Sequence, residues 1–309
     1  MKKIFIAVMA MAAFAACSNE NTIVTPQGAA IAFGDAFVDN ATKVIYEGNN
    51  KVEGFYVWGV VNDNVPIYAG AQVARNSKEY GAAWDFVGAV PARYWTPSCT
   101  YKFAAIANGN AKTVVNGLPT EISYTLNATN PADLIYGVVS AETNESGVPT
   151  EGVNNAGVVA FTMNHLLAKM YFTVTDNMGA DYTVTPTSIK VTKAEKSGTY
   201  TVGTTAINGT WTPGNDKSAE LEFVNGAQLI IPVEQALEVE ITYDIKFGNT
   251  TISTGAKKKG TITSTPYAAN TVYHITATIG ATAIQFSIDT VSGFGTPEQP
   301  EQGGSVTIQ

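Results

Sequence analysis

Few side chains in this sequence of 309 residues are of the types that carry catalysis or bind metals. The two histidines, His165 and His274, each stand in an apolar run, MNHLLAKMYF and VYHITATI. A metal centre needs several histidine, cysteine or carboxylate ligands at close spacing, which neither run supplies. We therefore expect each histidine to lie at a strand end or on a sheet face, with a backbone carbonyl as its partner, and we expect no metal or other cofactor.

The clearest carboxylate pair is Glu238 and Glu240, and glycoside hydrolysis would need two such acids. These acids alternate with apolar residues from Leu237 to Ile241, so the solvent-facing side of a strand accounts for them. Cys99 stands near the start of a strand-like run, where a small buried side chain is the simplest interpretation. Because the sequence has neither a GxSxG nucleophile motif nor a glycine-rich phosphate loop, it predicts a protein that is not an enzyme.

Tryptophans are the remaining candidates for a binding site, because aromatic faces form platforms for sugars. The sequence contains Trp58, Trp84, Trp95 and Trp211. Their positions near the ends of strand-like runs favour large core side chains over an exposed platform. A surface glycan-binding lipoprotein is the alternative function from another class, since such a protein would use these rings.

Composition limits the partners that the chain can bind. The formal net charge is −8, charged residues make up 14% of the sequence, and the arginines are Arg75 and Arg93. Nucleic acid binding requires a basic face, so nucleic acid is excluded as a partner. The abundance of Gly, Thr, Val and Ala favours sheet over helix.

Residues 1–17 have the pattern of a bacterial lipoprotein signal peptide. MKK is a positively charged start, IFIAVMAMAAFAA is a short apolar segment, and two small residues directly precede Cys17. The apolar segment is too short for a permanent membrane span. We expect Cys17 to be lipidated, and an ordinary secretory signal peptide is the simpler alternative.

Beyond Cys17 the sequence consists of short strand-like runs separated by Gly, Asn, Asp and Pro, without an amphipathic helix. The polar, turn-rich stretch at 141–157 divides these runs into two groups. Each group offers enough strands for a β-sandwich. We therefore predict an all-β protein of two consecutive antiparallel β-sandwich domains, at residues 18–148 and 149–283.

A tail at residues 284–309 follows the second predicted domain. Two runs in it, AIQFSIDTV and SVTIQ, alternate like half-buried strands and are joined by the linker SGFGTPEQPEQGG. The apolar faces of these two runs consist of Ile284, Phe286, Ile288, Val306 and Ile308. A strand without a neighbour is an unprotected edge in water, so we expect the tail to pair with another strand.

Taken in order, these features resemble the Bacteroidetes fimbrillins, the type V pilins. The second group of strands opens with FTMNHLLAKMYFTVT, in which a His–x–x–Ala–Lys run at residues 165–169 leads into an alternating strand, as in that family. The segments GFYVWGVV and YWTPSCTYKFAAIA are similar to the N-terminal domain of fimbrillins, where a Trp–x–Pro element precedes an aromatic strand. The similarity extends over the whole chain.

The resemblance implies two transthyretin-like β-sandwiches and a structural role in a cell-surface fimbria that supports adhesion or biofilm formation. Fimbrillins reach the outer membrane as lipoproteins, and a protease that cuts after a basic residue then removes the first strand. The C-terminal strands of a neighbouring subunit fill the opened groove, which is donor-strand addition. The implied partners are other copies of the chain, other fimbrillins and the maturation protease.

The sequence supplies residues for the two strands that this assembly implies. The removable strand would span about residues 29–43, with Ile31, Phe33 and Phe37 on one apolar face. The apolar residues of the tail at 284–309 would form the donor strand. An apolar face lost from the first strand would thus be matched by an apolar face gained from the tail.

The maturation cut is expected after Lys43, with Lys51 as the alternative. Fimbrillins are usually cut after an arginine, and the first arginine here, Arg75, stands well inside the first predicted domain. A chain left uncut would keep its lipid at Cys17 and its own first strand. Such a chain would serve as the membrane anchor of the fimbria, which is the alternative function within the family.

Overall fold

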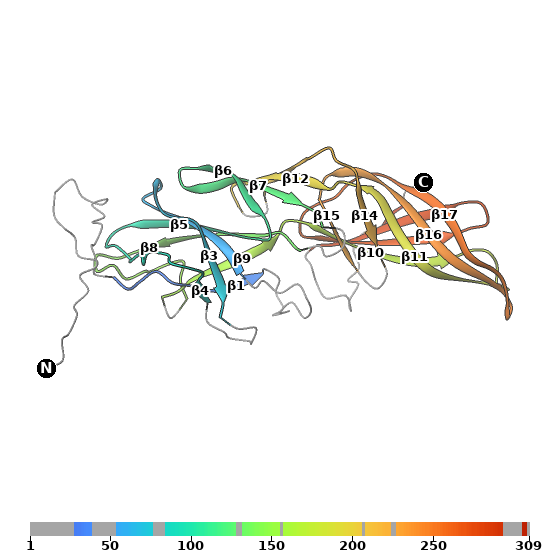
Figure 1. Ribbon diagram of the computed structural model, residues 1–309, viewed down its shortest axis with the longest axis horizontal. Helices are drawn as coiled ribbons and strands as arrows, with labels where there is room; N and C mark the ends of the chain where they lie inside the picture. Colours follow the sequence, from blue (N-terminus) through green and yellow to red (C-terminus); the bar gives the residue numbers. More distant parts are fainter. Residues whose placement is uncertain are drawn as a thin grey trace.

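The computed structural model describes residues 28–38, 54–76, 84–127, 132–154, 157–205, 208–223, 227–292 and 305–307. Within these ranges the chain forms twenty strands and no helix, which confirms the all-β prediction. The same ranges accordingly contain no helix of the length and apolarity needed to cross a membrane. Figure 1 shows an elongated body, with the strands of the first half at one end and those of the second half at the other.

Seven strands of the first half form one mixed sheet: β1 (Phe33–Val38), β2 (Gly54–Val61), β3 (Val65–Arg75), β4 (Trp84–Phe86), β5 (Thr100–Ala107), β8 (Ile135–Glu142) and β9 (Val159–His165). Their order is β1-β9-β8-β5-β2-β3-β4, and only β1 and β9 are parallel neighbours. The β-branched and aromatic runs GFYVWGVV and YKFAAIA become β2 and β5, which are buried over most of their length. They form the centre of the sheet.

Strand β9 extends this sheet beyond the expected end of the first domain. It pairs with β8 on one side and with β1 on the other. The polar stretch at 141–157 therefore connects two antiparallel neighbours of one sheet, and turn-rich composition is also what such a connection requires. The division between residues 148 and 149 stays a prediction, whereas the pairing places β9 with the strands of the first half.

The second half contains two sheets whose apolar faces share one core. One sheet consists of β10 (Ala168–Asp176), β15 (Gln228–Ile230), β18 (Thr271–Ile279), β19 (Ile284–Ser292) and β20 (Ser305–Thr307). The other consists of β11 (Tyr182–Ala194), β14 (Ala219–Glu222), β16 (Glu234–Phe247) and β17 (Thr250–Pro266). Their orders are β15-β10-β18-β19-β20 and β14-β11-β16-β17. β10 and β18 are parallel, unlike the strands of a purely antiparallel sandwich, because the long segment between them lets the chain return to the same end of the sheet.

A fourth sheet joins the two halves and consists of β6 (Asn110–Val115), β7 (Leu118–Thr125), β12 (Ser197–Thr201) and β13 (Thr210–Pro213). Its order is β13-β12-β7-β6, so β7 of the first half pairs with β12 of the second. Buried side chains from both halves, among them Ile122 and Tyr200, belong to a single core cluster. The halves therefore share both backbone hydrogen bonds and core, as the middle of Figure 1 shows.

Candidate functional site: the seat of the first strand

Residues 28–38 lie in a groove of the first half and have backbone partners on both sides. On one side the Ile31 N–H donates to the carbonyl of Arg93 (2.8 Å), and the Trp95 N–H donates to the carbonyl of Ala29 (3.1 Å). On the other side β1 pairs with β9 in parallel. The first strand is thus at the edge of its sheet, and the residues just before it bond instead to the backbone at residues 93–95.

Phe33 is the central side chain of this strand. It is 4% exposed, and its ring lies 5.4 to 5.9 Å, centroid to centroid, from four other aromatic rings. Those rings belong to Tyr68, Phe86, Phe103 and Phe161. Edge-on and stacked pairs of this kind stabilise a fold beyond the burial of their area. The first strand therefore supplies the middle of the aromatic core of the first half.

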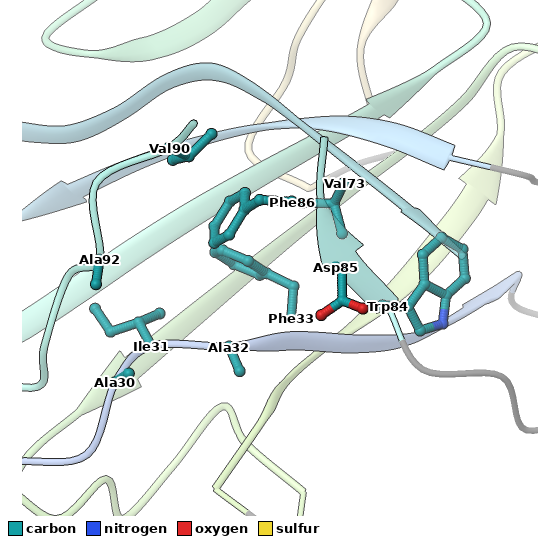
Figure 2. Close-up of a pocket in the computed structure, with 10 residues that line it drawn as sticks. All are labelled: Ala30, Ile31, Ala32, Phe33, Val73, Trp84, Asp85, Phe86, Val90 and Ala92. Atoms are coloured by element: carbon teal, nitrogen blue, oxygen red, sulfur yellow. The ribbon is translucent and has the colours of Figure 1, made fainter. Parts of the chain in front are cut away.

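A cavity of about 210 Å³ lies beside this aromatic cluster. Figure 2 shows it between residues 30–33 on one side and β4, Val90 and Ala92 on the other. Its lining is apolar except for Asp85. The first strand therefore leaves part of its own groove unfilled.

Glycines begin and end the seat, by which we mean the place that residues 28–34 occupy. A Cβ atom on Gly28 would stand 2.2 Å from the carbonyl oxygen of Trp95, so no other residue fits there. A Cβ atom on Gly34 would stand 2.8 Å from Cγ1 of Val158, a half-buried side chain that can change rotamer. The exposed residues between the two glycines are Ala29, Ala30 and Ala32. The seat thus requires glycine at its first position and buries the side chains at its fourth and sixth.

Of the three residues predicted for the apolar face of this strand, Ile31 and Phe33 have described side chains, and the side chain of Phe37 lies outside the description. Ile31 and Phe33 are both buried, as expected. The backbone then pairs Phe37 with Thr162 after a bulge that shifts the register between Gly34 and Phe37. A bulge interrupts the two-residue alternation of a strand, so the place of Phe37 on the apolar face stays a prediction. Several predicted residues, with the roles given to them, lie outside the described residues: Cys17, Lys43, Lys51 and Ile308.

The tail predicted at 284–309 has partners within its own chain. β19 pairs with β18 over its whole length, Phe286 and Ile288 are buried, and Ile284 packs against the same core. The apolar face of β19 thus completes the second-half core of its own chain, and the donor role of Ile284, Phe286 and Ile288 stays a prediction. β20 pairs with β19 over three residues, with Val306 opposite Ile288.

His165 stands at the end of β9 and is buried, with its Nδ1 in contact with the carboxylate Oδ2 of Asp133. One of its partners is thus a carboxylate, which the sequence did not predict. His274 lies on β18 with its ring 5.2 Å from that of Tyr171, and Cys99 is buried beside β5. In the part of the chain that the structure describes, no three His, Cys, Asp or Glu side chains gather as a metal site would require.

The pair Glu238 and Glu240 lies on the outer face of β16, as the alternation predicts. Glu238 contacts Lys193, and Glu240 contacts Lys257 (3.0 Å) and Lys259 (3.3 Å). Hydrogen bonds from Lys257 and then Lys259 lower the pKa of the Glu240 carboxyl. Cross-strand ion pairs on a wet sheet face therefore account for both acids.

Core packing accounts for the tryptophans. Trp58 and Trp95 are buried, and Trp84 and Trp211 are half-buried. The Trp211 Nε1–H donates to the carbonyl of Leu166 (2.8 Å). This bond connects β13 of the fourth sheet to the chain just after β9. Burial of Trp58 and Trp95 fits the core role predicted for the tryptophans, and the sugar platform stays an untested alternative.

The sequence matches the profile of a family described as fimbrillin-like over residues 42–292. Three solved structures share the fold. A candidate cell adhesion protein from Bacteroides uniformis is 14% identical, with 78% of this chain and 91% of that chain covered and a TM-score of 0.53. Another from Bacteroides ovatus is 11% identical, with 88% and 100% covered and a TM-score of 0.53. A third, from Parabacteroides distasonis, is 10% identical, with 88% and 99% covered and a TM-score of 0.50.

These solved structures are too distant in sequence to show more than a common fold. No curated protein matches the sequence significantly. The family match, by contrast, covers most of the chain and confirms the resemblance seen in the sequence. The chain therefore belongs to the fimbrillin-like family, which consists of structural pilus subunits and not of enzymes.

Proposed function

We propose that this chain is a polymerising subunit of a cell-surface fimbria and that proteolysis removes its first strand before assembly. A strand of a neighbouring subunit then takes the vacated seat. The observation that carries this proposal is the position of Phe33: the ring at the centre of the first-half aromatic cluster comes from an edge strand. That strand also precedes the family match, which begins at residue 42.

Removal of β1 would leave a groove that is unstable in water. The edge of β9 would lose its parallel partner, and an unpaired edge readily pairs with another chain. Burial of the Ile31 and Phe33 side chains contributes about 1.5–3 kcal/mol each, and this contribution would be lost. The aromatic rings around Phe33 would be exposed at the same time. The opened groove is therefore a strong acceptor for an apolar strand.

We assign the donor to the part of the tail that follows β19. β19 stays in its own subunit, because it pairs with all of β18 and its apolar face is buried. Its residues Ile284, Phe286 and Ile288 therefore form the fixed base of the tail. β20 is held by three residue pairs, so it would separate from β19. The apolar residues that separate with it are Val306 and, two residues later, Ile308. Addition of this strand to the next subunit is a head-to-tail contact that does not close, and such contacts build fibres.

The cut is assigned after Lys43, with Lys51 as the alternative. Both lysines stand between β1 and β2, so cleavage at either one releases the first strand and leaves every later strand in the chain. Before the cut, a lipid on Cys17 would hold the precursor at the outer membrane. The same cut would therefore open the groove and separate the subunit from its membrane anchor.

An anchor subunit is the second candidate function. It is favoured by the absence of arginine before Arg75. An anchor would keep Cys17 and its own first strand, and would donate its tail without accepting one. It would stand at the base of the fimbria.

The intact mass and N-terminal sequence of protein sheared from its own cell surface separate the two candidates. A chain that begins at Val44 or Val52, without lipid, is expected for the polymerising subunit. A chain that begins at acylated Cys17 would contradict that role and leave the anchor. The double variant Lys43→Gln, Lys51→Gln is the matched control, because it should stay on the cells in its lipidated form.

A further inference from the structure

The seat of the first strand and the end of the sequence have the same residue pattern. Residues 28–34 read GAAIAFG, and residues 303–309 read GGSVTIQ. Each begins with glycine and carries large apolar side chains at its fourth and sixth positions. The second, third and fifth positions hold glycine, alanine, serine or threonine in both segments.

The structure gives a physical reason for each part of this pattern. At the first position a Cβ atom on Gly28 would stand 2.2 Å from the carbonyl oxygen of Trp95 and 2.9 Å from that of Gly147. At the fourth and sixth positions Ile31 and Phe33 are buried. The second, third and fifth positions are exposed, so small apolar and hydroxyl side chains are equally acceptable there.

We infer that residues 303–309 of a second copy occupy the seat of residues 28–34 one for one, in the same direction and parallel to β9. Gly303 then takes the place of Gly28, and the six following residues keep the order of the first strand. This inference rests on the proposed function, because the seat becomes free only when the first strand is removed.

Only one register satisfies the seat. If Gly304 stood at the first position, the strand would shift by one residue, and Val306 and Ile308 would turn to the exposed side. A shift by two would place Ser305 at the first position, against the carbonyl of Trp95. Only with Gly303 at the first position does the strand have a glycine there and apolar side chains at the buried fourth and sixth positions.

The backbone of the seat is satisfied in this register. The carbonyl at the second position accepts from the Trp95 N–H (3.1 Å), and the N–H at the fourth position donates to the carbonyl of Arg93 (2.8 Å). The carbonyl at the fifth position accepts from the Val159 N–H (2.9 Å). Since residues 303–309 contain no proline, the incoming strand offers all three groups.

Two positions of the incoming strand fit less closely than those of the first strand. Ile308 is smaller than Phe33 and would leave part of the ring-lined space empty. Gln309 would stand where a Cβ atom lies 2.8 Å from Cγ1 of Val158, which must then change rotamer. The register therefore predicts that Ile308→Phe, which restores a ring, makes assembly tighter.

The test uses the full chain, cut after Lys43 by limited proteolysis with the cut verified by mass, and follows assembly by light scattering. Gly303→Ala is expected to weaken assembly about tenfold or more, because its Cβ atom overpacks the first position. Gly304→Ala is the matched control, since alanine already occupies the second position in the first strand; its assembly should stay within about twofold of the unsubstituted chain. Ile308→Phe should slow disassembly.

The outcomes separate the register from the proposed function. If the unsubstituted cut chain does not assemble, the proposed function fails, and the register with it. If it assembles and both glycine variants assemble equally, or both fail equally, this register is wrong and donor-strand addition stands. The uncut variants should melt at the temperature of the unsubstituted chain, because the substitutions lie beyond β19; this control shows that a loss of assembly is not a loss of folding.

Discussion

The Phe286 ring lies across Gly260: a Cβ atom on Gly260 would stand 2.7 Å from Cε2 and 3.0 Å from Cζ of the ring. The absence of a side chain at Gly260 thus lets β17 of one sheet approach β19 of the other. Phe286 belongs to the buried core as a result. This contact is one reason why β19 packs in the core of its own chain.

Gly260→Ala is expected to lower the free energy of unfolding by about 1–3 kcal/mol, because the added methyl group overpacks the Phe286 ring. Urea denaturation measures the change. Thr261→Ala, at the exposed neighbouring position, should stay within about 0.5 kcal/mol of the unsubstituted chain. Equal losses in the two variants would show that the contact with Phe286 is not what makes glycine necessary.

Phe33→Ala in the uncut chain is expected to lower the free energy of unfolding by about 3–5 kcal/mol, since it empties the space between four rings. Ala32→Ser, at an exposed neighbour, is the control and should change stability little. After cleavage at Lys43 and loss of the first strand, the two variants should be indistinguishable in chemical denaturation. A difference that persists would mean that the strand has not left.

Sequence periodicity predicted which residues form the apolar face of a strand better than it predicted which strands pair. Alternation identified Ile31 and Phe33 as a buried face, yet it could not foresee the bulge after Gly34, because an inserted residue leaves no mark on composition. The alternation of apolar residues in β19 was equally clear from the sequence. Which sheet would bury that face depends on contacts between distant segments, and the sequence alone does not specify them.

The same limit applies to His165. The sequence predicts a place at a strand end or on a sheet face for this histidine, and it stands at the end of β9. Asp133, its carboxylate partner, stands in a polar segment before β8, and only the pairing of β8 with β9 brings the two side chains together. The contact between Asp133 and His165 could have been predicted only by knowing that β8 and β9 pair.

Asp133→Ala is expected to lower the free energy of unfolding by about 3–5 kcal/mol, because it removes the carboxylate that contacts the buried His165 side chain. Glu238→Ala, which removes an exposed ion pair with Lys193, provides the comparison and should cost about 1 kcal/mol or less. Thermal and urea denaturation of both variants give the contrast. A small effect for Asp133→Ala would mean that the remaining contacts of His165 suffice.

Glu240→Gln tests the charge pairs on the outer face of β16. Lys257 and Lys259 lower the pKa of the Glu240 carboxyl from its usual 4.5, so its contribution to stability is present above pH 4.5 and is lost as the pH falls through the lowered pKa. The variant should melt below the unsubstituted chain at neutral pH, and the difference should vanish in acid. Melting curves from neutral pH to about pH 2, repeated in high salt to screen the charges, check this.

Deletion of residues 293–309 is expected to leave the melting temperature of the uncut chain nearly unchanged, since β20 is held by three residue pairs. After the cut, the deleted chain should accept a donor strand but form no polymer by itself. Ile288→Ala, by contrast, should lower the free energy of unfolding by about 2–5 kcal/mol because it opens the second-half core. A large loss of stability on deletion would place β20 in the subunit's own fold.

In a fibre of such subunits, the connections between the two halves would determine how tension is carried. A pull would enter at the groove of the first half and leave through the tail of the second. β9, which pairs with the first strand, continues directly into β10, so the covalent backbone would carry the pull from one half to the other, while the pairing of β7 with β12 would keep the halves aligned. Each subunit would then bear load as one stiff rod. The weakest link in the fibre would be the junction between subunits, where a single strand lies in its groove.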